Sequence, residues 1–105
     1  MINVDRAIRA IKSVDTLNAD ALCKSSLDGS TYCAIGAMLH YTGTLDGELL
    51  LHGLSTTLLN RLWVQYELTE DMVYKLIALN DSARPCNRKR QVITELRRLA
   101  NDQQG

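Results

Sequence analysis

Residues 28–39 read DGSTYCAIGAML, and this stretch decides the fold. It opens on Asp28-Gly29, a pair that is typical of a tight hairpin turn. It continues into small and apolar residues that predict a buried helix over residues 32–41. Gly36 lowers the stability of such a helix by about 1 kcal/mol relative to alanine. We therefore expect this helix to be the central packing element, with another element lying close against Gly36.

The elements predicted around this helix are mostly helical. Short strands near residues 21–24 and 31–33 are expected to pair across the turn. Residues 44–54 contain two glycines and three consecutive leucines, and they show no clear pattern. Helices are predicted over 4–14 with Asn3 as N-cap, from Ser55 to Tyr66, from Thr69 to Leu79, and over 86–101. The sequence thus predicts a mainly α protein, a compact bundle of about five helices with one short β-hairpin near residues 21–33, in a single domain over residues 1–105.

The net charge is zero, but the charges are unevenly distributed. The 105 residues include 12 basic and 12 acidic side chains, and 46% of the chain is apolar. A neutral chain is not expected to coat nucleic acid generically, because that requires a surplus of Lys and Arg. Residues 43–71, however, hold five acidic side chains and one basic one. Residues 84–98 hold one acidic side chain and six basic ones, which are Arg84, Arg88, Lys89, Arg90, Arg97 and Arg98.

The absence of a recognisable targeting signal and the odd number of cysteines point to a cytoplasmic protein. The first residues show no signal-peptide pattern, and no run approaches the ~18 apolar residues that span a bilayer. The three cysteines, an odd number, are expected to be reduced thiols, and this includes Cys23 and Cys33 on either side of the turn. Cysteine and histidine spacing shows no metal-site pattern, so we expect no metal. We also expect no cofactor and, because no long apolar run is present, no membrane contact.

Two motifs carry a resemblance to known proteins. Residues 33–38 read CAIGAM, and Leu79-Asn80-Asp81 follows about forty residues later, before an amphipathic helix. Together they resemble small uncharacterised phage and prophage proteins with a Cys-x-x-Gly-[Ala/Val]-Leu motif and a downstream Leu-Asn-Asp. This chain departs from the pattern at Met38, at Ala34, where many members have a second Cys, and after Asp81, where a Gly is missing. The resemblance implies a phage or mobile-element accessory protein, which would act in the host cytoplasm, and supplies no reaction.

Asn80 and Asp81 are the most informative polar pair. Two short side chains after the apolar face of a helix are typical of a helix end and turn. We expect one of them, Asp81 in the first instance, to cap a neighbouring helix, namely the one that begins at Cys33, whose first N–H groups lack partners. The alternative is that Asp81 acts as a general acid or base beside Cys33 or His40.

Cys33 is the candidate nucleophile. A helix N-terminus stabilises a thiolate, but His40 lies ~10 Å farther along the same helix and cannot pair with it. A buried structural thiol is therefore the favoured interpretation, and a reactive one is the alternative.

The favoured function is non-catalytic binding of a host macromolecule, most simply a protein. No phosphate-binding loop, paired acid and base, or triad spacing appears. Trp63 and Tyr66 belong to the core by default; if they are exposed, they would anchor an interface and favour a homodimer. The first alternative is nucleic-acid binding by the basic C-terminal helix, because residues 69–100 resemble a helix-turn-helix with a long break at residues 80–85. The second is a small enzyme that uses Cys33.

Overall fold

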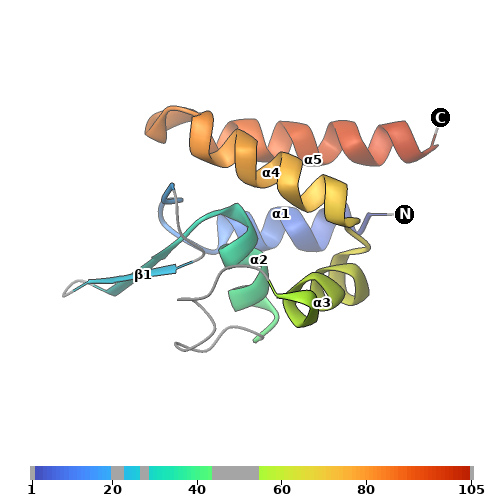
Figure 1. Ribbon diagram of the computed structural model, residues 1–105. Coiled ribbons are helices and arrows are strands. Elements are labelled where there is room, and N and C mark those ends of the chain that lie inside the picture. The colour runs from blue at the N-terminus through green and yellow to red at the C-terminus, as the bar shows by residue number, and fades with distance from the viewer. Residues whose placement is uncertain (1, 20–22, 27–28, 44–54, 105) are drawn as a thin grey trace.

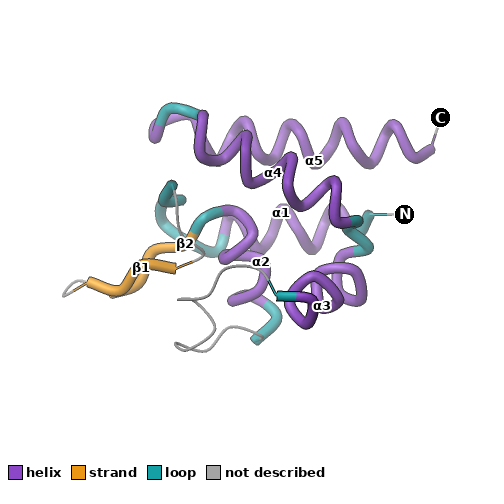
Figure 2. The backbone as a smooth tube through the Cα atoms, in the orientation of Figure 1, coloured by secondary structure: helices purple, strands orange, loops and turns teal. Residues whose placement is uncertain are grey.

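The computed structural model describes residues 2–19, 23–26, 29–43 and 55–104. Figures 1 and 2 show a helical bundle with a hairpin extending from one side. The predicted class, a mainly α bundle of about five helices with one short hairpin, is confirmed in these residues. The elements are α1 (Val4–Lys12), β1 (Cys23–Ser26), β2 (Gly29–Tyr32), α2 (Ala34–Tyr41), α3 (Thr56–Tyr66), α4 (Glu70–Ser82), the 3-10 turn η2 (Pro85–Asn87) and α5 (Arg88–Gln104).

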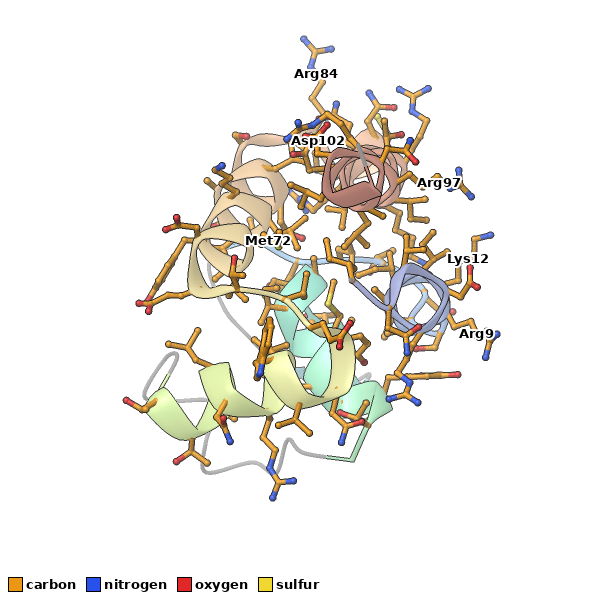
Figure 3. The ribbon with its side chains drawn as sticks, turned by 90° about the vertical axis from the view of Figure 1, so that its right-hand side faces the viewer. Arg9, Lys12, Met72, Arg84, Arg97 and Asp102 are labelled. Atoms are coloured by element: carbon orange, nitrogen blue, oxygen red, sulfur yellow. The ribbon has the colours of Figure 1, made fainter. Side chains whose placement is uncertain are left out.

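Helix α2 lies at the centre of the molecule. Every residue of α2 from Ala34 to Leu39, including Gly36, is buried. The helix packs against α1, α3 and α4, and Figure 3 shows it surrounded by them. The predicted role of this helix as the packing centre is therefore confirmed. Gly43, at a positive φ of 73°, follows its last turn and donates its N–H to the His40 carbonyl at 3.0 Å.

The hairpin forms, but Gly29, predicted as a turn residue, lies in a strand. Cys23 pairs with Tyr32, and Ser26 pairs with Gly29. Gly29 therefore belongs to β2 rather than to the turn, while residues 27–28 lie outside the described residues, as do 20–22 and 44–54. At Tyr32, the last residue of β2, Leu17 forms a parallel bridge, and Asn18 donates its N–H to the Tyr32 carbonyl at 2.8 Å.

Three helices begin with side-chain caps, at the predicted cap Asn3 and at the predicted starts Ser55 and Thr69. The side chains of Asn3, Ser55 and Thr69 each accept a hydrogen bond from the backbone N–H three residues later. Helix α1 ends at Lys12, earlier than the predicted Val14. Ser13 is its C-cap: the backbone N–H donates to the Arg9 and Ala10 carbonyls, and the hydroxyl donates to the Ala10 carbonyl.

The predicted turn at Asn80-Asp81 is wrong. Helix α4 continues through both residues to Ser82, and the N–H of Ala83 still donates to the Leu79 carbonyl at 3.0 Å. The break before η2 is therefore shorter than the expected break at residues 80–85. Helix α5 also begins later than predicted, at Arg88, and runs to Gln104.

Across the described ranges, no helix combines the length and the apolar character that a bilayer crossing requires.

Candidate functional site

Asn80 joins three segments of the chain in the interior. Its side chain is completely buried. Its Oδ1 accepts a hydrogen bond from the Ala34 N–H at 3.0 Å, and its Nδ2 donates to the Asn18 carbonyl at 2.8 Å and to Asp81 Oδ1 at 3.1 Å. Asn80 therefore supplies the expected cap of α2. Asp81 does not supply it; this residue is exposed, and its carboxylate contacts the capping amide.

Arg88, the first residue of α5, completes this arrangement. Only 7% of Arg88 is exposed. Its guanidinium donates to three backbone carbonyls, those of Asn80 at 2.7 Å, Leu17 at 2.9 Å and Ala83 at 3.0 Å. The last carbonyls of a helix lack intrahelical donors, and the guanidinium supplies donors at the end of α4. We call Leu17, Asn18, Ala34, Asn80, Ala83 and Arg88 the Asn80–Arg88 joint.

The basic stretch does not form one contact face. Arg88 is buried in the joint, so the expectation that it contacts nucleic acid is wrong. Lys89 donates to the Val14 carbonyl, and Arg90 donates to Asn87 Oδ1 at 3.0 Å. Arg98 pairs with Glu95 and with Asp102 on the same helix. Hydrogen bonding to Arg98 lowers the pKa of Glu95, as expected for an ordinary helical ion pair.

Arg84 and Arg97, the two remaining members of the stretch, lie far apart on the surface. Figure 3 shows Arg84 projecting from one end of the bundle and Arg97 lying on the side that carries Lys12 and Arg9. A duplex would require these cations along a common line of phosphates. Helix α5, which would be the DNA-recognition helix of a helix-turn-helix, therefore does not present the six basic side chains of residues 84–98 on one face.

Cys33 is a structural thiol in this arrangement. It is 4% exposed and is the N-cap of α2, where its Sγ accepts from the Gly36 N–H at 3.4 Å. Burial raises the pKa of Cys33, which opposes formation of the thiolate nucleophile. The nearby Asp81 charge also raises this pKa and so does not activate the thiol. His40 is exposed, and its ring stacks on Tyr32 with centroids 4.5 Å apart.

Iodoacetamide labelling separates the two described thiols. Cys33 is buried, whereas Cys86 is exposed. At neutral pH we expect Cys86 to be alkylated at roughly the rate of a free thiol, and Cys33 to react only when the protein unfolds. Mass spectrometry of digested samples would give both rates. Labelling of Cys33 faster than Cys86 would restore the catalytic alternative.

Trp63 and Tyr66 are neighbours on α3 but differ in burial. Tyr66 is completely buried, and its hydroxyl donates to the Met38 carbonyl at 2.6 Å. Burial raises the pKa of Tyr66 to about 12, so the phenol stays protonated at neutral pH. Tyr66 therefore ties α3 to the central helix, in the core as expected by default, and it does not meet the exposure condition for an interface. Trp63 is 52% exposed, so its default placement in the core is wrong and it meets that condition.

Trp63 belongs to a groove where α3 meets the start of α4. Glu67 ends α3 with a positive φ of 57°, and the turned chain buries Leu68 beside the tryptophan. The hollow, of about 390 Å³, is lined by apolar and polar side chains together, namely Thr56, Leu59, Asn60, Trp63, Leu68, Thr69 and Glu70. We call it the α3–α4 groove. The sequence pattern identified its tryptophan, but the other walls come from the packing of two helices.

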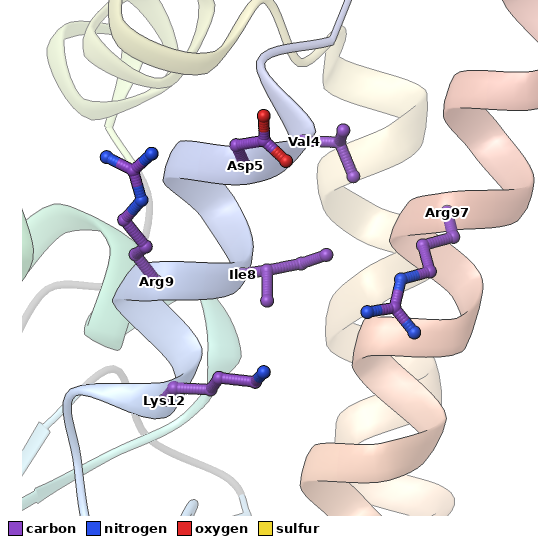
Figure 4. Close-up of a pocket in the computed structure, with 6 residues that line it drawn as sticks. All are labelled: Val4, Asp5, Ile8, Arg9, Lys12 and Arg97. Atoms are coloured by element: carbon purple, nitrogen blue, oxygen red, sulfur yellow. The ribbon is translucent and has the colours of Figure 1, made fainter.

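A second hollow lies between α1 and α5 and was not predicted. It has a volume of about 310 Å³ and is lined by Val4, Asp5, Ile8, Arg9, Lys12 and Arg97. Figure 4 shows the Arg97 side chain extending from α5 toward Ile8 and Lys12 on α1. We call it the α1–α5 groove. The polar face of α1 was a partial signal for it, but the sequence does not show that α5 packs beside that face.

Among the residues that the structure describes, no group of three or more His, Cys, Asp or Glu side chains could hold a metal ion.

Comparison with known proteins finds no matching family model, no matching curated protein and no matching solved structure.

Proposed function

We propose that this chain is a non-catalytic binding protein whose partner is another protein, and that the partner docks in the α3–α4 groove. The observation that supports this most strongly is the half-exposed Trp63 beside the apolar Leu59 and Leu68. Tryptophan is among the residues that most often dominate binding energy at protein interfaces. A groove that combines apolar walls with a few polar groups offers both contact area and orientation.

The charge of the groove restricts the chemistry of the partner. Glu70 lines the groove, and Asp71 is exposed one residue farther along α4. Both lie in the first turn of α4, where their negative charges interact favourably with the helix dipole and stabilise the helix. A docking segment with an apolar anchor and a basic flank would complement this surface.

The cellular setting follows from the resemblance to phage and prophage proteins. We propose a cytoplasmic protein whose partner is a host protein.

The structure gives the two alternative functions, nucleic-acid binding and thiol catalysis, weaker support. The nucleic-acid alternative loses Arg88 to the interior, and the thiol-enzyme alternative has a buried Cys33 with a raised pKa. A homodimer through Trp63 would occupy the same groove, so it competes with a host partner.

Paired substitutions on α3 test the proposal. Trp63 and Val64 are adjacent and comparably exposed, at 52% and 60%, but only Trp63 lines the groove. With the protein immobilised and a bacterial host lysate passed over it, we expect Trp63→Ala to reduce capture of the partner by about tenfold or more. Val64→Ala is expected to leave capture unchanged. Quantitative mass spectrometry gives the comparison, and sedimentation at the same concentration reports self-association.

The difference in captured partner between Trp63→Ala and Val64→Ala tests whether the α3–α4 groove is the docking site. Equal capture by Trp63→Ala and the unmodified protein would contradict the assignment of the groove. Failure of the unmodified protein to enrich any protein would contradict the proposed function itself.

A further inference from the structure

The α1–α5 groove concentrates positive charge from two distant parts of the sequence. Arg9 and Lys12 lie on α1, and Arg97 comes from α5. All three are exposed, and Asp5 is the single carboxylate among the lining residues. Within the described residues, the three cations form no ion pair or hydrogen bond. The lining residues therefore carry an excess of two positive charges; Lys12 and Arg97 extend toward the gap between the helices, whereas the Arg9 guanidinium points away from Arg97 (Figure 4).

The fold holds these charges together through the apolar contacts behind them. Ala7 and Ile11 of α1 and Val92 and Leu96 of α5 are completely buried in one core. Because α1 packs against α5, the backbone positions of Lys12 and Arg97 are fixed on the two sides of the same groove. Like charges held near each other oppose folding, and a bound anion would remove that cost.

The geometry points to a phosphate monoester as the ligand of the α1–α5 groove. A phosphate monoester carries a charge of about −1.5 to −2 at pH 7, which matches the excess in the groove. Guanidinium groups form paired hydrogen bonds with phosphate oxygens, and the Lys12 ammonium adds a point charge. Val4 and Ile8, both partly buried, form an apolar wall for the group that carries the phosphate.

A nucleic-acid backbone fits this groove less well than a monoester does. Each phosphodiester carries a single charge, and a duplex needs cations at regular spacing along its strands. The other basic residues of α5 are bound to backbone carbonyls, to the Asn87 side chain or to acidic side chains, and Asp5 would repel a continuous line of phosphates. The same monoester chemistry can come from a phosphorylated side chain or from a nucleoside monophosphate.

Titration of the isotopically labelled protein with three probes tests the proposal. The probes are inorganic phosphate, O-phosphotyrosine and adenosine monophosphate, with tyrosine and adenosine as unphosphorylated controls. We expect saturable amide shifts confined to α1 and the facing part of α5, with both phosphorylated probes binding more tightly than their controls. Preference for phosphotyrosine would identify a phosphorylated side chain as the source, and preference for the nucleotide would identify a mononucleotide.

Variants that each replace one basic side chain with glutamine locate the binding site. Arg97→Gln and Lys12→Gln are expected to weaken binding of the better probe by about tenfold or more. Arg84→Gln, an exposed substitution that does not line the groove, is expected to change it by less than about twofold. Unchanged binding in Arg97→Gln, or no saturable shift below about 10 mM probe, would overturn the proposal. Tighter binding of a duplex without terminal phosphates would also overturn it, in favour of a polynucleotide. These outcomes are independent of Trp63.

Discussion

Replacing Asn80 with alanine is expected to lower the free energy of unfolding by about 2–4 kcal/mol. The side chain is completely buried and forms hydrogen bonds to the Ala34 N–H and to the Asn18 carbonyl. Its removal leaves the buried Ala34 N–H and the partly buried Asn18 carbonyl without this partner, and an unsatisfied buried group costs about 1–3 kcal/mol. Urea denaturation followed by circular dichroism would measure the loss.

Asn101→Ala is the matched control, because Asn101 is an exposed asparagine within a helix. It is expected to change stability by less than about 0.5 kcal/mol. A change of similar size in both variants would mean that Asn80 contributes no more than a surface asparagine. The hydrogen bonds of the joint would then be energetically unimportant.

Arg88→Met is expected to cost about 3 kcal/mol of stability. The substitution removes three charge-assisted donors and leaves the carbonyls of Leu17, Asn80 and Ala83 with fewer partners. The loss stays below the sum of three such bonds, because the buried guanidinium also paid a desolvation cost that methionine does not. Arg88→Lys is not expected to restore stability, since one ammonium cannot reach three divergent carbonyls.

Arg90→Met provides the comparison from the same helix. Arg90 is exposed and makes one hydrogen bond to a side chain, so we expect a change of less than about 0.5 kcal/mol. If Arg88→Met were as mild as Arg90→Met, Arg88 would be free to act at the surface. The case for a nucleic-acid interface would then regain its strongest residue.

Local patterns predicted much of the fold. The caps at Asn3, Ser55 and Thr69 each depend on a side chain and an N–H three residues apart, and such contacts can be inferred from sequence. The burial of α2 follows from its unbroken run of small and apolar residues. These features required no knowledge of the rest of the chain.

The remaining features depend on contacts between distant residues. Asn80 bonds a residue 46 positions away, and Arg88 bonds one 71 positions away. The sequence indicated a cap near Asn80-Asp81, but it could not determine which of the two side chains faces α2 while α4 continues through both. A basic stretch likewise does not show that one of its arginines is buried and another faces α1. The α1–α5 groove was missed for this reason.

Amide hydrogen exchange at Ala34 in the unmodified protein tests the central claim most directly. If Asn80 anchors the start of the central helix, the Ala34 N–H should exchange only through global unfolding, as slowly as core amides of α4 such as that of Leu76. Exchange of Ala34 at nearly the rate of an unstructured peptide would contradict the account. It would mean that the N–H is open to water and that Asn80 does not hold α2 in place.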